Sequence, residues 1–292
     1  MRIMALDTSG KAVSVAVAED GRLCSHFYLR HGKTHAEALM PCIDATLSGL
    51  DLKLSDIGAF AAITGPGSFT GLRIGLAAVK AMAYANNVGV VGVPTLDALA
   101  YNMHGYPDAL LCPVMDARNG NVYQAIYLAA CAGADAAAGA DTAAGANPGA
   151  AMETAAGTGA DAAACADTAA CTGEFMKTAA CAGEFMKTVE FAALLSKGAA
   201  ADRLKSALKL CGGVKRVIFN GDAAETYFDF FRGELAGLAQ CTVAEERAIS
   251  QNAAAAALLA CGAVAAGRLE PPGHLVPEYL NDGYIRIHTH GA

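Results

Sequence analysis

The chain has 292 residues, of which 54% are hydrophobic and 17% are charged, and its formal net charge is -7 at pH 7. This length is sufficient for two substantial cores, and the acidic balance disfavours autonomous binding of nucleic acid, which needs a clustered basic face. Asp7 follows Met1 too soon for a secretory signal, and the sequence contains no apolar run of membrane-spanning length, so we expect a cytoplasmic protein without a membrane partner.

The chain opens with three predicted strands. Arg2 to Thr8, Val13 to Glu19 and Arg22 to Leu29 are separated by short turns, which is typical of a β-meander. Asp7-Thr8-Ser9 ends the first strand. An acid at this position could orient a magnesium ion or water, or it could cap the turn beside it, and both roles stay open.

A helix, a strand and a second helix are predicted next. Thr34 begins the first helix through a capping box with Glu37. Residues 59 to 63 form a charge-free apolar run, which indicates a strand buried on both faces. Gly65-Pro66-Gly67 ends this strand in a tight turn. Ser68 or Thr70 then caps a helix that runs to about residue 86.

The helix from Ser68 to about residue 86 is apolar on more than one side, so we expect a second cover besides its own sheet. A core helix within one domain and a docking helix for a partner both fit this pattern. The glycine turn before the helix also allows a phosphate contact, because free backbone N–H groups and the helix dipole favour an anion there. The turn is neither a Walker motif nor a dinucleotide fingerprint, and a purely structural role is the alternative to phosphate contact.

A second half is predicted from about residue 106 onward. Residues 110 to 128 predict a hairpin around Asn119-Gly120. Residues from about 129 to 188 are rich in alanine, glycine and threonine and include two copies of a ten-residue repeat, so we expect an insertion that is mostly disordered or loosely helical. Phe191 to Leu210 predicts a helix, and Asn220-Gly221-Asp222 follows a predicted strand.

Histidines and cysteines indicate no metal site. The ten cysteines are scattered and are expected to be apolar fillers in a reducing compartment. His31 and His35 are four residues apart, but the helix begins at Thr34, so the two side chains do not share a helix face.

Gly65-Pro66-Gly67-Ser68-Phe69-Thr70-Gly71-Leu72-Arg73-Ile74-Gly75 resembles the signature of the TsaB (YeaZ) family. The resemblance implies an α/β protein with the two-lobed actin-like, sugar kinase and Hsp70 ATPase fold, built from βββαβαβα half-units. It implies an N-terminal lobe over residues 1 to 105 and a C-terminal lobe over residues 106 to 292, interrupted by the insertion at about 129 to 188.

The same resemblance implies a non-catalytic subunit of the complex that makes threonylcarbamoyladenosine (t6A) on tRNA. In that family the partner TsaD transfers threonylcarbamoyl to the adenosine next to the anticodon, and the ATPase TsaE joins the complex. We expect tRNA to be contacted only through the complex. A homodimer in isolation, and ATP or ADP at the complex interface, are compatible with the resemblance.

The resemblance also assigns residues. TsaD carries two metal-binding histidines after the corresponding strand, whereas this chain has Thr95 and Leu99 there, so no catalytic or metal residue is expected. Asn281 replaces the arginine of the family's closing motif. The expected partner-binding residues are Leu39, Ile43, Leu72, Ile74, Gly75, Leu76, Ala78, Val79 and Met82. The expected vestigial nucleotide-binding residues are Asp7, Thr8, Ser9, Gly65, Gly67, Ser68 and Gly221.

The alternative is an independent enzyme of the same superfamily, either an ATP-dependent kinase-like protein or a metallopeptidase-like protein. The kinase version requires Asp7, the Gly65 turn and the Gly221 turn to hold one nucleotide together. The peptidase version lacks metal histidines and a nucleophile with an adjacent base.

Overall fold

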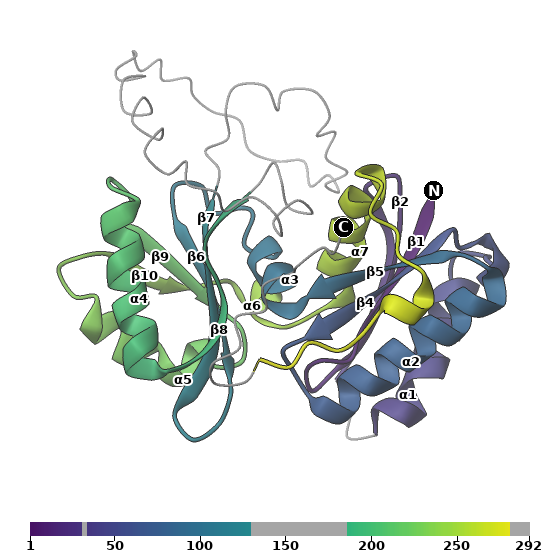
Figure 1. Ribbon diagram of the computed structural model, residues 1–292, viewed down its shortest axis with the longest axis horizontal. Coiled ribbons are helices and arrows are strands. Elements are labelled where there is room, and N and C mark those ends of the chain that lie inside the picture. The colour runs from purple at the N-terminus through teal and green to yellow at the C-terminus, as the bar shows by residue number, and fades with distance from the viewer. Residues whose placement is uncertain (31–33, 130–185, 281–292) are drawn as a thin grey trace, which may run out of the picture.

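The structure is a computed structural model that describes residues 1–30, 34–129 and 186–280, and it contains two five-stranded sheets (Figure 1). The first sheet has the order β3-β2-β1-β4-β5 and the second has the order β10-β9-β6-β7-β8. The strands of the first sheet are β1 (Arg2–Asp7), β2 (Val13–Glu19), β3 (Arg22–Leu29), β4 (Ala59–Gly65) and β5 (Gly89–Pro94). Those of the second are β6 (Leu110–Asp116), β7 (Asn121–Ala129), β8 (Met186–Ser196), β9 (Arg216–Asn220) and β10 (Gln240–Val243).

The helices follow the strands in the predicted alternation. They are α1 (His35–Ser48), α2 (Phe69–Asn86), α3 (Thr95–Tyr101), α4 (Lys197–Leu210), α5 (Ala224–Glu234), α6 (Glu246–Ile249) and α7 (Ala253–Ala265), with 3₁₀ turns η1 (Leu54–Asp56) and η4 (Pro272–His274). The expected caps are present. Thr34 and Glu37 form the capping box of α1, and Ser68 accepts the backbone N–H of Gly71 at the start of α2.

Both sheets have the same topology. In each, the first three strands pair antiparallel, and the first strand also pairs parallel with the strand that follows the first helix. β6 therefore corresponds to β1, and β9 corresponds to β4. This repetition confirms the predicted two-lobed fold built from βββαβαβα half-units.

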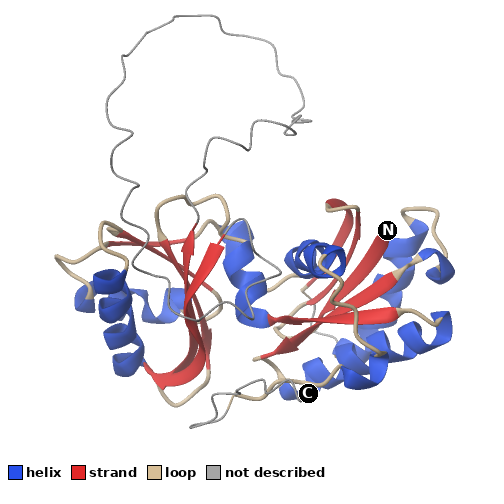
Figure 2. Ribbon diagram, turned by 45° about the horizontal axis from the view of Figure 1, so that its top comes forward, coloured by secondary structure: helices blue, strands red, loops and turns tan. Residues whose placement is uncertain are grey.

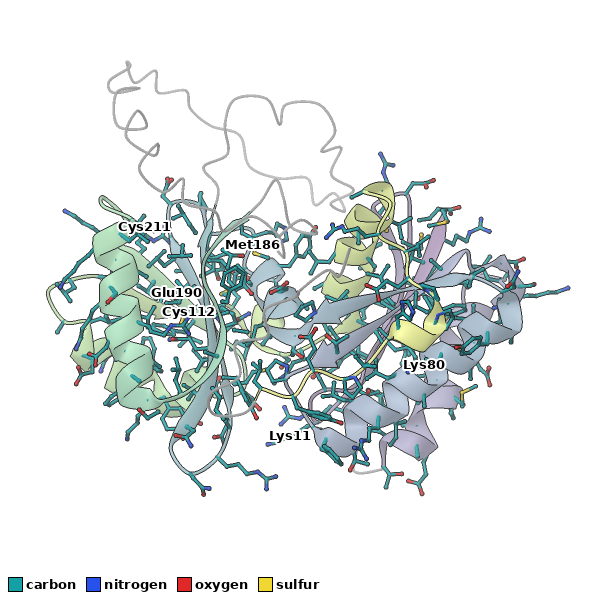
Figure 3. The ribbon with its side chains drawn as sticks, in the orientation of Figure 1. Lys11, Lys80, Cys112, Met186, Glu190 and Cys211 are labelled. Atoms are coloured by element: carbon teal, nitrogen blue, oxygen red, sulfur yellow. The ribbon has the colours of Figure 1, made fainter. Side chains whose placement is uncertain are left out.

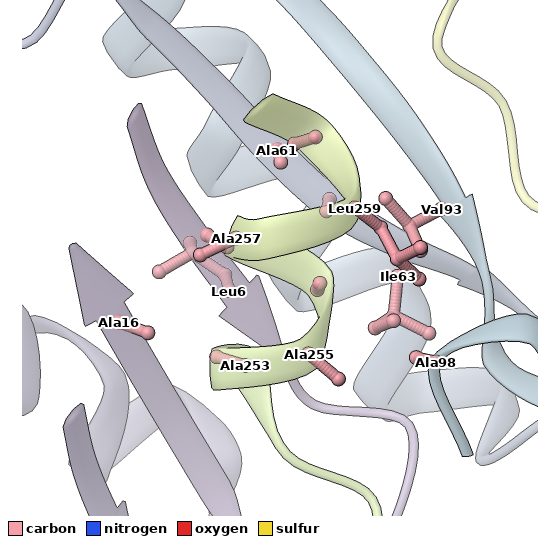
Figure 4. Packing of buried hydrophobic residues seen from close by; sticks show 14 of the residues in the cluster. Leu6, Ala16, Ala61, Ile63, Val93, Ala98, Ala253, Ala255, Ala257 and Leu259 are labelled. Carbon is pink, nitrogen blue, oxygen red and sulfur yellow. The ribbon is translucent and has the colours of Figure 1, made fainter. Parts of the chain in front are cut away.

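Helices cover both faces of the first sheet (Figure 2). α1 and α2 lie on one face, and α7 crosses the opposite face and contacts all five strands. α7 carries alanine at most of its buried positions, which lets it approach the strands closely, as Figure 4 shows around Ala257 and Leu6. α7, a late element of the chain, thus completes the core of the sheet that the first strands form.

The two sheets share a core through α3, which contacts β4 and β5 of the first sheet and β6 and β7 of the second. The larger cluster of buried apolar residues extends from the first sheet to Leu111, Met115 and Ile218 of the second. The predicted division at residues 105 and 106 therefore separates two sheets that are packed together. α7, which comes after the second sheet in sequence, packs on the first sheet. As a statement about domains it stays a prediction.

The prediction of a helix from Phe191 is wrong for its first part. Residues up to Ser196 belong to β8, which pairs antiparallel with β7, and only from Lys197 does the chain become helical. Pairing with β7 overrides the local helical preference of the alanines and leucines here. β8 also includes Met186 and Thr188, which were expected in the insertion, while residues 130–185 lie outside the described residues.

Within residues 1–30, 34–129 and 186–280, none of the helices combines the length and apolar character needed to span a bilayer.

Candidate functional site

The turn between β1 and β2 lies directly on the first turns of α2. The Ser68 backbone N–H donates to the Ser9 carbonyl at 2.7 Å, and the Thr8 hydroxyl donates to the Gly71 carbonyl at 2.7 Å. A Cβ at Gly71 would be 2.0 Å from the Thr8 carbonyl oxygen. Glycine is required at position 71 because the two backbones touch.

Two more glycines of the motif serve the same contact. A Cβ at Gly67 would be 2.7 Å from the Ser9 carbonyl oxygen, and one at Gly75 would be 2.3 Å from the Thr8 Oγ1 atom. The spacing of Gly67, Gly71 and Gly75 therefore presents a side-chain-free surface of α2 to the hairpin. The motif encodes a packing contact between two segments that are distant in sequence.

Asp7 caps the hairpin turn. Its Oδ1 atom accepts the Ser9 backbone N–H at 2.9 Å and the Ser9 hydroxyl at 2.7 Å, while its Oδ2 atom is buried without a hydrogen-bond partner among the described residues. Burial raises the pKa of Asp7, and the bonds from Ser9 and the nearby His35 oppose this effect. The cap is the role that these contacts give Asp7.

The remaining predicted nucleotide residues do not form an open phosphate cradle. The hairpin backbone fills the space beside Gly67 and Ser68. Gly65 and Gly221 both have positive φ, and a Cβ on either would clash with backbone, at 2.4 Å from the Glu278 oxygen and 2.2 Å from the Val114 oxygen respectively. Backbone thus lies against these glycine positions, and nucleotide binding by these residues stays a prediction. Asp7, Thr8 and Ser9 do lie beside Gly67 and Ser68, as the sequence predicts.

Gly221 follows β9 of the second sheet. Lys11, in the turn between β1 and β2, extends toward the loop that contains Gly221. Lys11 extends between the two lobes (Figure 3), and its charge acts on Asp222, lowering that pKa against the larger raising effect of burial. Asp222 Oδ1 accepts the Asp116 backbone N–H at 3.0 Å. This bond joins the loop after β6 to the loop after β9. Among the residues that the structure describes, no third metal-ligating side chain joins Asp116 and Asp222.

Most of the predicted partner-binding residues are buried by the chain itself. These are Leu39, Ile43, Leu72, Gly75, Leu76, Val79 and Met82, whereas Ile74 and Ala78 are half-buried. The buried residues pack between the helices and the first sheet, so the expectation that they form an outward surface is corrected. Binding of a partner by α1 and α2 stays a prediction, but other side chains must carry it.

The outward side of α2 consists of different residues. Phe69, Arg73, Ala77 and Ala81 are exposed and recur every four residues, so they lie along one stripe of the helix. We call these four residues the outer stripe. The side chain of Phe69 is 54% exposed, and Met40 on α1 is 52% exposed.

The end of the described chain supplies the second cover of α2. Glu270 and Val90 exchange backbone hydrogen bonds of 2.9 and 2.8 Å, and the Glu278 backbone N–H donates to the Thr64 carbonyl at 2.8 Å. Between these points the segment passes along α2 through η4, the yellow stretch in Figure 1. We call residues 269–280 the strap. Asn281 lies outside the described residues.

Thr95 and Leu99, the two positions at which no metal ligand was expected, serve packing. Thr95 and Leu99 are both fully buried. The Thr95 hydroxyl donates to the Pro66 carbonyl at 2.6 Å, and the Leu99 carbonyl accepts the Asn220 side-chain amide at 2.7 Å. These contacts join the glycine turn and the second sheet to α3.

A half-buried acid that sequence reasoning missed, Asp97, lies between them in the sequence. Asp97 accepts a short hydrogen bond from the Tyr127 hydroxyl of β7. Burial, together with the charge of Glu278, raises the pKa of Asp97 to about 6, although the bond from Tyr127 lowers it. The pKa of Tyr127 is also raised by burial and by Asp97. A single acid and a tyrosine 30 residues apart gave no sequence signal.

Ser14 and His26 form a serine–histidine pair that the sequence did not indicate. Their Oγ and Nε2 atoms are 2.8 Å apart, but Ser14 is 1% exposed and also accepts the Ala253 backbone N–H at 3.0 Å. Burial lowers the pKa of His26, which lines a cavity of about 580 Å³ with Tyr101 and Tyr106. Ser14 is therefore a cap for α7 rather than an accessible nucleophile. His31 lies outside the described residues.

A family model described as "TsaD: tRNA N6-adenosine threonylcarbamoyltransferase" matches residues 30–282. Over 127 residues the chain is 32% identical to the tRNA threonylcarbamoyladenosine biosynthesis protein TsaB of Bacillus subtilis, covering 44% of this chain and 55% of that protein. Over 130 residues it is 38% identical to the protein of the same name from Escherichia coli, with the same two shares covered. The chain thus matches about half the length of these curated relatives.

The structural comparison extends over nearly the whole chain. The solved structure of YeaZ from Pseudomonas aeruginosa has a TM-score of 0.62 at 20% identity, covering 96% of this chain and 99% of that one. At this identity the match shows the fold alone.

We predict that Gly71→Ala strongly destabilises the protein, because the added methyl group would meet the Thr8 carbonyl and force α2 away from the hairpin. The expected loss is more than about 2 kcal/mol in the free energy of unfolding, measured by urea denaturation. Gly233→Ala in α5 is the control, since no atom lies within 4 Å of its Cβ position, and it should gain up to about 1 kcal/mol. Equal stability of Gly71→Ala and the unaltered protein would contradict the packing role.

We predict that Asp97→Asn stabilises the protein above about pH 7. The folded-state pKa of about 6 lies above the ordinary aspartate pKa of 3.8, so the folded state binds the proton more tightly and loses stability as pH rises through this window. Asparagine still accepts the Tyr127 hydroxyl but never ionises. The gain should be about 1 to 3 kcal/mol at about pH 7.5 and should vanish below about pH 4, by denaturation at each pH.

Tyr127→Phe is the matched control for Asp97. It leaves the carboxylate buried without its donor, so the protein should lose stability at about pH 7.5. A pH-independent gain from Asp97→Asn would show that ionisation of Asp97 is not the cause.

Proposed function

Because this chain belongs to the TsaB (YeaZ) family, and to the broader family described as TsaD: tRNA N6-adenosine threonylcarbamoyltransferase, we propose that it acts in the biosynthesis of threonylcarbamoyladenosine on tRNA. Its role is that of a non-catalytic subunit. It binds a TsaD-like subunit, which carries the transfer chemistry, and the first lobe provides the contact.

The observation that carries this proposal is the burial of Thr95 and Leu99. A buried threonine whose hydroxyl is held by the Pro66 carbonyl, and a buried leucine, cannot ligate a catalytic metal. The hydroxyl of Ser14 is likewise committed to structure, and the glycine turns are filled by backbone. These features favour a supporting role over the kinase-like and metallopeptidase-like alternatives.

The outer stripe of α2 is the proposed docking surface. Ala77 and Ala81 are small and exposed, so the helix of a partner can approach α2 closely there. Phe69 on the same stripe and Met40 on α1 provide exposed large apolar side chains. Self-association through the same surface is the proposed origin of a homodimer when the partner is missing.

We assign tRNA binding to the assembled complex and not to this chain. The net charge of -7 provides no excess of cations to neutralise phosphates. A TsaE-like ATPase belongs to the same proposal, and any ATP or ADP would bind where subunits meet.

We predict that Ala77→Arg weakens binding to the TsaD-like subunit of the same organism at least about tenfold, because the long charged side chain blocks close helix approach. The affinity is measured by isothermal titration calorimetry with purified subunits. Ala199→Arg on α4 is the matched control, because Ala199 is exposed on a helix of the second lobe and should leave binding unchanged.

Both variants should keep the melting temperature of the unaltered chain, since each replaced alanine is exposed. Leu76→Arg is unsuitable here because Leu76 is only 3% exposed and the charge would enter the chain's own core. Equal binding by Ala77→Arg and Ala199→Arg would refute the docking surface. Threonylcarbamoyl transfer by this chain alone would refute the non-catalytic role.

A further inference from the structure

Three side chains form a compact exposed group where the strap meets α2. The Arg73 guanidinium lies over the Phe69 ring, 3.8 Å from its centroid, and the Arg73 Nε–H donates to the Tyr279 hydroxyl at 3.1 Å. The Phe69 and Tyr279 rings are 5.2 Å apart. Phe69 thus contacts the face of the Arg73 guanidinium, and Tyr279, which is 206 positions after Arg73, binds its edge.

The hydrogen bond to Tyr279 uses the Nε–H of Arg73 and not its terminal NH₂ groups. No carboxylate among the described residues forms an ion pair with Arg73. Glu278, beside Tyr279, has its backbone N–H bound to Thr64, and its charge acts on Asp97. The group therefore presents a cation that no carboxylate of residues 1–30, 34–129 or 186–280 pairs with.

The Arg73 guanidinium is suited to bind an anion with two oxygen atoms, such as a carboxylate. A guanidinium offers parallel N–H donors that match a carboxylate in bidentate geometry. Its stacking on Phe69 and its bond to Tyr279 reduce the rotamer freedom lost on binding, which favours affinity. The first turn of α2 adds the positive end of a helix of 18 residues.

We propose that Arg73, held by Phe69 and Tyr279, receives a carboxylate side chain of the TsaD-like subunit and is a principal contact of the docking surface. This inference rests on the proposed function, because Phe69 and Arg73 belong to the outer stripe. Tyr279 acts as a positioning residue, and the strap is thereby part of the binding site although it lies far from α2 in sequence.

The test compares Arg73→Lys and Tyr279→Phe by calorimetry with the purified TsaD-like subunit and no tRNA. Arg73→Lys keeps the charge but loses the bidentate geometry, so the dissociation constant should rise about tenfold or more. Tyr279→Phe keeps the ring and loses only the bond to Nε, so a smaller rise of about threefold is expected. The double variant should be no weaker than Arg73→Lys alone, because Tyr279 acts through Arg73.

Arg232→Lys is the matched control. Arg232 is an exposed arginine over the ring of Phe228, at 5.6 Å, on α5 of the second lobe, and its replacement should leave the affinity within twofold. The affinity of the unaltered chain should also fall more steeply with salt than that of Arg73→Ala.

Each outcome discriminates. If Arg73→Lys and Tyr279→Phe bind normally while Ala77→Arg does not, the carboxylate receptor is wrong and the docking surface stands. If Ala77→Arg also binds normally, the proposed surface itself is wrong. If Arg73→Lys binds the subunit normally but the complex loses tRNA, Arg73 contacts phosphate and the proposal is overturned.

Discussion

The turn after β1 and the first turns of α2 approach so closely that only hydrogen atoms fit between them. A methyl group at Gly71 would be 2.0 Å from the Thr8 carbonyl oxygen, and both Thr8 and Ser9 are tied to α2 by hydrogen bonds. This contact sets the depth at which α2 lies on the first sheet. The outer stripe, the position of Arg73 and the seat of the strap all depend on that depth.

The same half-unit occurs twice, and the comparison separates what the fold needs from what is special to the first lobe. Gly65 ends β4 and Gly221 follows β9, both with positive φ and both pressed against backbone. A left-handed glycine at this strand end is therefore a requirement of the half-unit. The run of Gly67, Gly71 and Gly75, in contrast, contacts the hairpin between β1 and β2 of the first lobe.

The sequence was sufficient for the fold class, the strand order of the meander, the caps of α1 and α2, and the closeness of Asp7 to the glycine turn. The sequence did not predict which side chains of α2 face the sheet and which face outward. α2 is apolar on several sides, and periodicity cannot say which side the sheet takes, so Leu72, Leu76 and Val79 were expected outside although they are buried. The helix predicted over residues 191 to 210 is wrong for its first six residues, because pairing with β7 decides that segment, and it is confirmed from Lys197 onward. The group of Arg73 and Tyr279 depends on tertiary structure alone.

The return of α7 and the strap to the first sheet has a consequence for synthesis on the ribosome. The five strands of that sheet emerge early, yet the alanine-rich helix that covers their second face is encoded after the whole of the second sheet. One apolar face of the first sheet therefore stays uncovered while the rest of the chain is translated. The order in which the elements are encoded thus delays completion of the first core until α7 has been synthesised.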